Sequence, residues 1–282
     1  GDSLWIGTAQ GVWQAHAGGW SRPAWSGMFH RPNALMAIAT DTDGSRWIGS
    51  QRGLWRQRGD APPEPVRTGG ADIPRPAGAL LLQPDGALWA PVSGLGLGFL
   101  RSDWRQLARF NGAADGLHGG MYRALAPARA GGLWLGGYNG RVERLRADGS
   151  VQALDPDSLE RLRNIKPFAL LEDRAGRLWI GHRTGLLRIG ADGAIDEWTP
   201  ADAVDATPSG QIDHLQLAAD GRLWLVAPGG GLQQRDPATG RVLLDLPAGA
   251  GSGLGSADIE TLAISPRGEV WVAGEDGVAV LD

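Results

Sequence analysis

Seven tryptophans recur along the chain at intervals of 42 to 47 residues, and this repeat limits the possible folds more than any other feature. Most of them stand in a short apolar segment beside glycine, as in the Leu-Trp-Ile-Gly sequence at 178–181. A period near 45 residues that contains several short strands is typical of propeller blades. We therefore expect an all-β, seven-bladed β-propeller of four-stranded antiparallel blades, with one blade for each of Trp5, Trp47, Trp89, Trp134, Trp179, Trp224 and Trp271.

Glycines at fixed distances from each tryptophan predict the turns of the blade. Six repeats have a glycine three residues before the tryptophan, and six have one six residues after it. The first predicts the hairpin that leads into the tryptophan strand, and the second predicts the hairpin that leaves it. Apolar segments such as 34–39 and 168–171 predict the first strand of a blade, and 197–199 and 242–246 predict the fourth.

The repeat is incomplete at both ends of the chain. The sequence begins in the tryptophan strand of the first repeat, at 4–6, and stops after the third strand of the last repeat, at 278–281. We therefore expect the first and last blades to be incomplete. Residues 1–282 are expected to form a single propeller domain, cut from a longer receptor whose flanking segments supply the missing edge strands.

The repeat also resembles a known family. Gly-Arg-Leu-Trp-Ile-Gly at 176–181 followed by Gly-Leu-Leu-Arg at 185–188, and Leu-Trp-Ile-Gly-Thr at 4–8 followed by Gly-Val-Trp at 11–13, are similar to the two-component regulator propeller repeat. The resemblance covers essentially the whole chain. It implies the extracytoplasmic sensor region of a bacterial hybrid histidine kinase or diguanylate cyclase, located in the periplasm, with the catalytic output elsewhere in the parent protein. The sequences at 89–92 and 224–227 depart from the pattern.

Composition excludes several classes of function. The formal charge is −4 and no basic stripe is present, which argues against nucleic-acid binding. The chain has no cysteine, so it has neither disulfides nor a thiolate nucleophile. No apolar run is long enough to span a membrane. The five histidines are not spaced as metal ligands, and we expect neither a metal nor a cofactor.

Candidate binding residues lie in the connections after the tryptophan strand and between successive blades. Such connections converge at one face of a propeller and carry its function. Arginines, amides and tyrosines gather there, which is the mix expected for a polar or anionic small molecule such as a saccharide or a carboxylate. The candidates are Arg31, Gln51, Arg52, Tyr122, Tyr138, Asn139, Lys166, His182, Arg183, Gln211 and His214.

The hypothesis that follows is a non-catalytic sensory propeller of a transmembrane receptor, which binds a small ligand or a partner and self-associates through the parent receptor. One alternative is a scaffold for protein docking or dimerisation. It would be favoured if the tryptophans outside the repeat position, such as Trp13 and Trp20, were exposed together. Another alternative is a propeller enzyme similar to the streptogramin lyases, which are also seven-bladed with Leu-Trp in every repeat.

Overall fold

The structure is a computed structural model, and it describes residues 4–281 with interruptions. The residues outside the description are 1–3, 9–10, 17–18, 31–34, 69–70, 74–75, 77–78, 84–85, 93–95, 101–106, 111–115, 118–120, 155–164, 209, 250–252, 255–258, 266, 275–276 and 282. The chain divides into two compact units, Gly1–Leu125 and Ala126–Asp282, and the division falls within one strand, β14. That residues 1–282 act as one domain stays a prediction.

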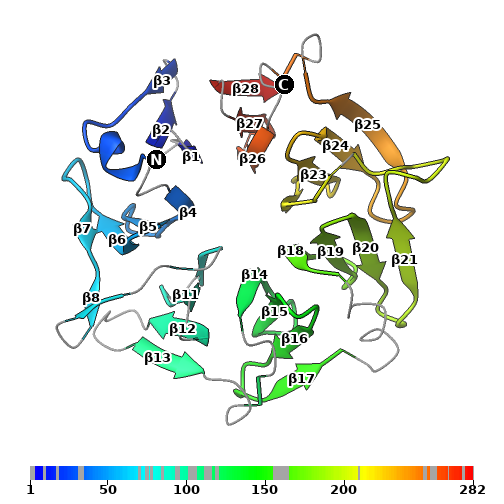
Figure 1. Cartoon of the computed structure of the whole chain (residues 1–282), viewed down its shortest axis with the longest axis horizontal. Coiled ribbons are helices and arrows are strands. Elements are labelled where there is room, and N and C mark those ends of the chain that lie inside the picture. The colour runs from blue at the N-terminus through cyan, green and yellow to red at the C-terminus, as the bar shows by residue number, and fades with distance from the viewer. Residues whose placement is uncertain are drawn as a thin grey trace. The chain divides into compact units, whose positions relative to one another are not determined.

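The fold is an all-β propeller of seven blades, each an antiparallel meander in chain order (Figure 1). Blade 1 contains β1 (Leu4–Thr8), β2 (Gly11–His16) and β3 (Gly19–Ser21). Blade 2 contains β4 (Leu35–Thr40), β5 (Arg46–Ser50), β6 (Gly53–Gln57) and β7 (Glu64–Pro65). Blade 3 contains β10 (Leu81–Leu82), β11 (Leu88–Val92), β12 (Gly96–Leu100) and β13 (Leu107–Phe110).

The remaining blades follow the same order. Blade 4 contains β14 (Tyr122–Pro127), β15 (Leu133–Gly137), β16 (Val142–Leu145) and β17 (Val151–Ala153). Blade 5 contains β18 (Pro167–Glu172), β19 (Leu178–His182), β20 (Gly185–Ile189) and β21 (Ile195–Trp198). Blade 6 contains β22 (His214–Leu217), β23 (Leu223–Ala227), β24 (Gly231–Arg235) and β25 (Val242–Pro247). Blade 7 contains β26 (Ile259–Ile264), β27 (Val270–Gly274) and β28 (Gly277–Leu281).

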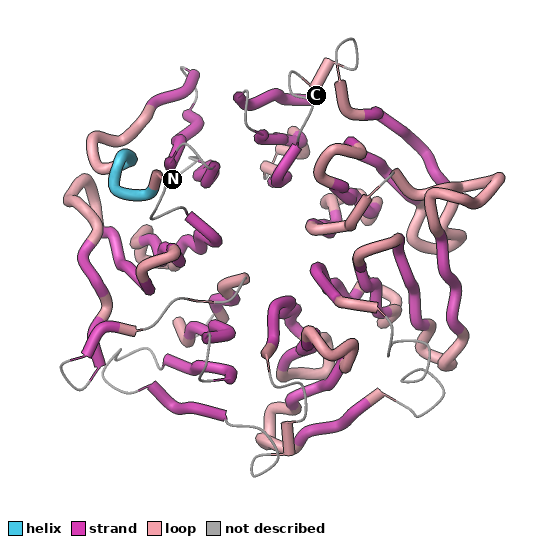
Figure 2. Tube along the Cα trace, viewed as in Figure 1, coloured by secondary structure: helices cyan, strands magenta, loops and turns pink. Residues whose placement is uncertain are grey.

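Little else of the described chain is regular. A small hairpin of β8 (Arg67–Thr68) and β9 (Ala71–Asp72) follows blade 2, and a short 3-10 helix, η1 (Ser26–Phe29), follows blade 1 (Figure 2). Trp25, just before η1, is buried and stacks on Trp5, with ring centroids 5.8 Å apart. Of the tryptophans outside the repeat position, Trp13 and Trp20 are half-buried, so they do not form an exposed aromatic platform together.

The turn prediction is confirmed. Each of the seven tryptophans lies on the strand predicted for it, from β1 to β27. All six glycines that precede these strands have a positive φ between 78° and 94°, which the hairpin requires and which side chains with a Cβ rarely adopt. Among the described residues blade 1 begins with its tryptophan strand, and blade 7 ends with its third strand. Both end blades therefore have three strands, as the sequence predicts.

The repeated tryptophans fill the space between successive blades within each unit. Trp47 of blade 2 packs with Leu88 and Leu100 of blade 3. In the same way Trp179 of blade 5 packs with Leu223 and Leu225 of blade 6. Trp47 and Trp179 are both 0% exposed. Because the indoles of Trp47 and Trp179 pack on apolar residues of the next blade, the tryptophan strand contributes to the hydrophobic core between these blades.

A buried indole N–H needs an acceptor, and the first hairpin of the blade supplies it. Asp41, Gln83 and Asp173 each lie six residues before their tryptophan and accept its Nε1–H, at 3.3, 3.1 and 3.0 Å respectively. In blade 4 this position is Ala128, and Glu172 from the neighbouring strand β18 accepts the Nε1–H of Trp134 instead, at 2.6 Å. In blade 7 the Nε1–H of Trp271 donates to Glu269, two residues before it, at 3.4 Å. The acceptor of the indole N–H therefore differs in position from blade to blade.

An arginine on the third strand covers the indole in three blades. Arg56, Arg144 and Arg188 lie opposite Trp47, Trp134 and Trp179 in the strand register. Their guanidinium carbons are 4.7, 5.6 and 5.4 Å from the ring centroids, within range of a cation–π contact. The arginine at this repeat position therefore covers one face of the indole at the interface between blades.

Asp173 accepts more hydrogen bonds than Asp41 or Gln83, and its substitution tests its role as the acceptor of the indole N–H. Its carboxylate also accepts the backbone N–H groups of Ala175 and Arg177 and the Nε–H of Arg177, at 2.9, 3.0 and 2.6 Å. Burial opposes ionisation, but the hydrogen bonds from Trp179 and Arg177 outweigh it and lower the pKa of Asp173 below its ordinary value. Asp173→Ala should cost about 3 kcal/mol of unfolding free energy at pH 7, because buried donors lose their acceptor.

Urea denaturation measures this cost. Asp148→Ala is the control, because Asp148 is exposed and, among the residues that the structure describes, accepts hydrogen bonds only from Ser150. The contribution of Asp173 should be complete above its ordinary pKa of about 4 and should decline as the pH falls through its lower pKa in the folded protein. Equal stability of the two variants at pH 7 would contradict the role of Asp173 as the indole acceptor.

Candidate functional site

Each blade presents two sets of turns at opposite ends of its strands. The turn between the first and second strands and the turn between the third and fourth lie at one end, which we call the hairpin end. The turn between the second and third strands lies at the other end, together with the connection to the next blade, and we call this the rim end. Antiparallel pairing fixes this arrangement. The described candidates from the sequence all lie at the rim end of their strands.

Three of the described candidate residues, Gln51, Arg52 and Tyr122, lie in unit 1. Gln51 and Arg52 form the exposed turn between β5 and β6. Ser50 Oγ shapes this turn, because it accepts the backbone N–H of Arg52 at 3.2 Å and the Nε1–H of Trp55 at 3.0 Å. Tyr122, at the start of β14, is only 2% exposed, so its side chain lies within the protein. Arg31 lies outside the described residues.

In unit 2 the backbone brings three candidate segments together. Pro167, which follows Lys166, pairs with His182 in the register of β18 and β19. The backbone N–H of Ile212, which follows Gln211, donates to the carbonyl of His182 at 3.0 Å. The connection to blade 6 therefore lies directly on the turn of blade 5. Residues that are far apart in the sequence meet at this point of the rim end.

The exposed charged candidates at the point where these three segments meet are cationic. Lys166 and Arg183 are exposed, while Gln211 and His214 are half-buried. In the neighbouring blade 4, the turn between β15 and β16 carries Tyr138, which is half-buried, and Asn139, which is exposed. Blade 4 adjoins blade 5, because β15 contacts β18. The Asn139 side chain accepts the N–H of Arg141 at 3.2 Å, which fixes the turn. These residues offer guanidinium, ammonium and amide donors and one aromatic ring. We define Tyr138, Asn139, Lys166, Arg183 and Gln211 as the rim cluster.

His182 is also at this position, but its side chain is buried and 0% exposed. Its Nδ1 lies 3.4 Å from the backbone nitrogen of Thr184. Its Nε2 lies 4.0 Å from the Glu197 carboxylate and has no hydrogen-bond partner among the described residues. Burial lowers the pKa of His182 to about 4, so the ring is neutral at pH 7. His182 therefore supports the turn from within the blade, while the neighbouring Arg183 faces solvent.

One supporting residue of the site was not anticipated from the sequence. Arg235 is 0% exposed and donates from Nη2 to the backbone carbonyls of Asp205 and Ala206, at 2.7 and 2.9 Å, and from Nη1 to the carbonyl of Gly240. Burial lowers its pKa to about 10, and it stays charged at pH 7. Because Asp205 and Ala206 belong to the connection between β21 and β22, Arg235 anchors the segment that leads to Gln211.

The site contains no preformed metal centre within the part of the chain that the structure describes: no three acidic or histidine side chains gather there as ligands. The same part contains no helix of the length and apolarity needed to cross a bilayer. The side chains of the rim cluster supply hydrogen-bond donors and positive charge.

The burial of His182 predicts an acid-dependent loss of stability. An unfolded histidine takes up a proton near pH 6.5, whereas the folded His182 does so only near pH 4. Its contribution to stability should be complete above pH 6.5 and should be lost as the pH falls to about 4, to the extent of about 3 kcal/mol. Urea unfolding of the wild type and of His182→Gln measures this, and the difference between the two proteins should change with pH. A pH-independent difference would contradict the prediction; His30→Gln, at an exposed position, is the control.

Comparison with known proteins gives structural neighbours. No protein-family profile matches the sequence, and no curated protein matches it either. The extracellular domain of BT4673 from B. thetaiotaomicron, described as a hybrid two-component system, superposes with a TM-score of 0.78 at 19% identity over 99% of this chain. That of BT3049 from the same organism, described likewise, gives 0.75 at 17% identity, also over 99%. The chain spans 36% and 38% of the length of these two domains.

A third neighbour is an enzyme. Catalytically inactive virginiamycin B lyase from Staphylococcus aureus, solved with quinupristin, has a TM-score of 0.74 at 16% identity, over 99% of this chain and 90% of the lyase. At these levels of identity the neighbours establish the fold alone. They confirm that the chain shares its seven-bladed architecture with the extracellular domains to which the repeat is similar.

Proposed function

We propose that the chain is the non-catalytic sensory propeller of a bacterial transmembrane signalling receptor and binds a small polar or anionic ligand at the rim cluster. The proposal places residues 1–282 as one extracytoplasmic domain in the periplasm, with the output domain elsewhere in the parent protein. The fold likeness to extracellular domains of two hybrid two-component systems supports this class over others.

The observation that carries the proposal is the contrast between the two ends of the blades in unit 2. At the hairpin end the tight turns repeat the same construction from blade to blade, with a glycine of positive φ at residues 131, 176, 221 and 268. At the rim end the turns also keep a glycine of positive φ, at residues 140, 185, 231 and 277, but their other residues differ from blade to blade and include exposed Arg183 and Asn139, with exposed Lys166 in the adjoining connection. Lysine and arginine recognise carboxylate oxygens through charge-assisted hydrogen bonds, and arginine can do so bidentately.

A signal would arise as a shift in population. A ligand bound to the connections between blades favours the receptor arrangement in which those connections are best ordered, and a coupling of about 1–3 kcal/mol is enough to change the output several-fold. Self-association through the parent receptor would convert this preference into a change between subunits.

The test is a calorimetric screen of organic acids, saccharides and amino acids against the purified chain. For a ligand at the rim cluster, Arg183→Ala should weaken binding about 10- to 100-fold, since a hydrogen bond to a charged group contributes about 1.5–3 kcal/mol. Lys166→Ala and Tyr138→Ala should each weaken it less. The matched control is Arg129→Ala, because Arg129 is exposed at the hairpin end of blade 4.

The outcome that would reject this location is a ligand whose affinity is unaffected by all three rim substitutions. Weakening by Arg129→Ala that equals the effect of Arg183→Ala would also reject it, because the loss would then reflect total charge. Arg52→Ala probes the corresponding turn of blade 2 in the same titration.

A lyase is the competing function, because virginiamycin B lyase aligns along nearly its whole length with this chain. Incubation of the purified chain with quinupristin, followed by mass spectrometry, distinguishes the two. The sensory proposal predicts that the cyclic depsipeptide stays intact with and without added Mg²⁺. Turnover that is abolished by a single histidine substitution would replace the sensor with an enzyme.

A further inference from the structure

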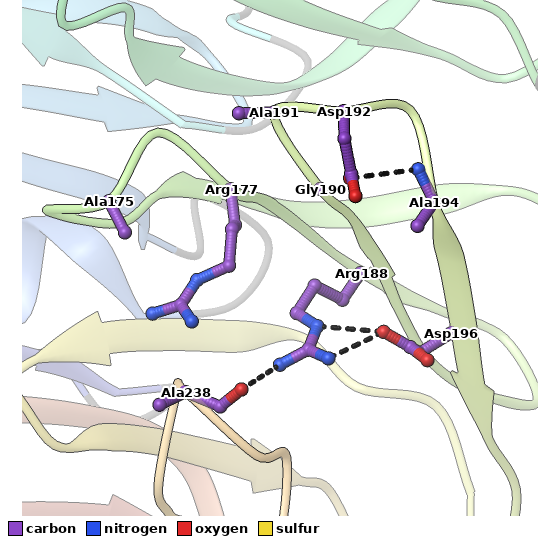
Figure 3. A pocket seen from close by; sticks show the side chains of 9 residues that line it. All are labelled: Ala175, Arg177, Arg188, Gly190, Ala191, Asp192, Ala194, Asp196 and Ala238. Atoms are coloured by element: carbon purple, nitrogen blue, oxygen red, sulfur yellow. Dashed lines mark hydrogen bonds and ion pairs between the residues drawn. The ribbon is translucent and has the colours of Figure 1, made fainter.

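A depression of about 370 Å³ lies between blades 5 and 6 at the hairpin end, within unit 2 (Figure 3). It is formed by the first hairpin of blade 5, the turn between β20 and β21, and the turn between β24 and β25 of blade 6. Its volume falls in the range of small-molecule sites. The lining residues are Ala175, Arg177, Arg188, Gly190, Ala191, Asp192, Ala194, Asp196 and Ala238.

Arg177 presents unused hydrogen-bond donors to this depression. Its Nε–H donates to Asp173 at 2.6 Å, and this contact holds the side chain in place. The side chain is 21% exposed, and its two terminal amino groups donate to no acceptor among the described residues. In Figure 3 the guanidinium lies beside Ala175 and Ala238, whose small side chains leave it accessible. A fixed guanidinium with free terminal donors is suited to a carboxylate.

Two carboxylates line another part of the same depression. Asp192 uses one oxygen to accept the N–H of Ala194 at 3.1 Å, within its own turn. Asp196 uses one oxygen, Oδ2, for both contacts with Arg188. Each carboxylate therefore retains an oxygen that accepts no hydrogen bond from the described residues. In Figure 3 both carboxylates lie apart from the Arg177 guanidinium.

Arg188 lies between the two sides and uses four of its five N–H donors within the protein. Its Nε and Nη2 donate to Asp196, and its Nη1 donates to the carbonyls of Pro237 and Ala238, both at 2.9 Å. The unused donors are therefore mainly those of Arg177, and the unused acceptors are those of Asp192 and Asp196. The lining holds two cationic and two anionic side chains, so its net charge is zero; Arg188 and Asp196 form an ion pair, whereas Arg177 and Asp192 lie apart (Figure 3).

We propose that this depression is a second binding site, separate from the rim cluster, for a small dipolar ligand that carries both a carboxylate and an ammonium group. The class is an α-amino acid or a short peptide. Arg177 binds the carboxylate through its terminal amino groups, and Asp192 with the free oxygen of Asp196 binds the ammonium group. A ligand with charge of one sign only would satisfy one side and leave the other side facing a like charge or solvent.

Calorimetry with glycylglycine as the probe tests the proposal, with succinate and putrescine as ligands that carry only one kind of charge. Two substitutions probe the site without touching Arg177, which the fold requires. Asp192→Asn removes the charge but keeps the oxygen that forms the turn, and Ala191→Phe fills the space. The matched control is Asp148→Asn, because Asp148 occupies the same position in the corresponding turn of blade 4 and accepts the N–H of Ser150 at 2.9 Å.

The expected result is glycylglycine binding that is at least tenfold tighter than that of succinate or putrescine. Asp192→Asn and Ala191→Phe should each weaken it tenfold or more, whereas Asp148→Asn and the rim substitution Arg183→Ala should leave it unchanged. The indole N–H resonance of Trp179, linked to Arg177 through Asp173, should shift on titration. Absence of binding at millimolar glycylglycine overturns the proposal, as does an affinity that both site substitutions leave unchanged. Either result leaves the rim cluster untouched, because Arg183→Ala tests that site with its own ligand.

Discussion

The structure depends on one repeated requirement: a large indole must be buried between blades while its single polar group finds an acceptor. The apolar surface of Trp47 or Trp179 provides the contact between neighbouring blades. The indole N–H would destabilise that contact if it were left unpaired. Asp41, Gln83 and Asp173 meet the requirement from the first hairpin of their own blade, and Glu172 meets it for the preceding blade.

This requirement also explains why the two ends of a blade differ. The hairpin end carries the acceptor, the glycine of positive φ and the tight turn that aims the carboxylate at the indole, so its sequence is constrained. The rim end keeps a glycine of positive φ as well, but among the described residues it supplies no acceptor to the repeated indoles, so the other residues of its turns are free to diverge. Divergent turns on a rigid scaffold are where binding residues accumulate. The rim cluster and the repeated hairpins are thus two consequences of one packing arrangement.

Much of the site could be placed from the sequence, because strand polarity alone assigns Tyr138, Arg183 and Lys166 to the same end of their blades. The exposure of each side chain could not be assigned in that way. His182 stands directly before Arg183 in the sequence, yet one is buried and the other is exposed. His182 is the last residue of β19, whose residues are all buried, whereas Arg183 lies in the turn that follows. The sequence did not reveal the anchoring role of Arg235 either, because the carbonyls that it binds lie about 30 residues away in the chain.

The sequence by itself determined the number of blades, the tryptophan strand and the hairpin turns. These features depend on local periodicity and on the conformational preference of glycine, which neighbouring residues already express. Only the tertiary structure decided which acceptor each indole uses, how the segment before β22 comes to lie on the turn of blade 5, and where Arg177 stands opposite Asp192. Those outcomes depend on how turns and strands pack in space, within one blade for Asp173 and Trp179 and between blades for Glu172 and Trp134, and no local pattern of the sequence expresses such packing.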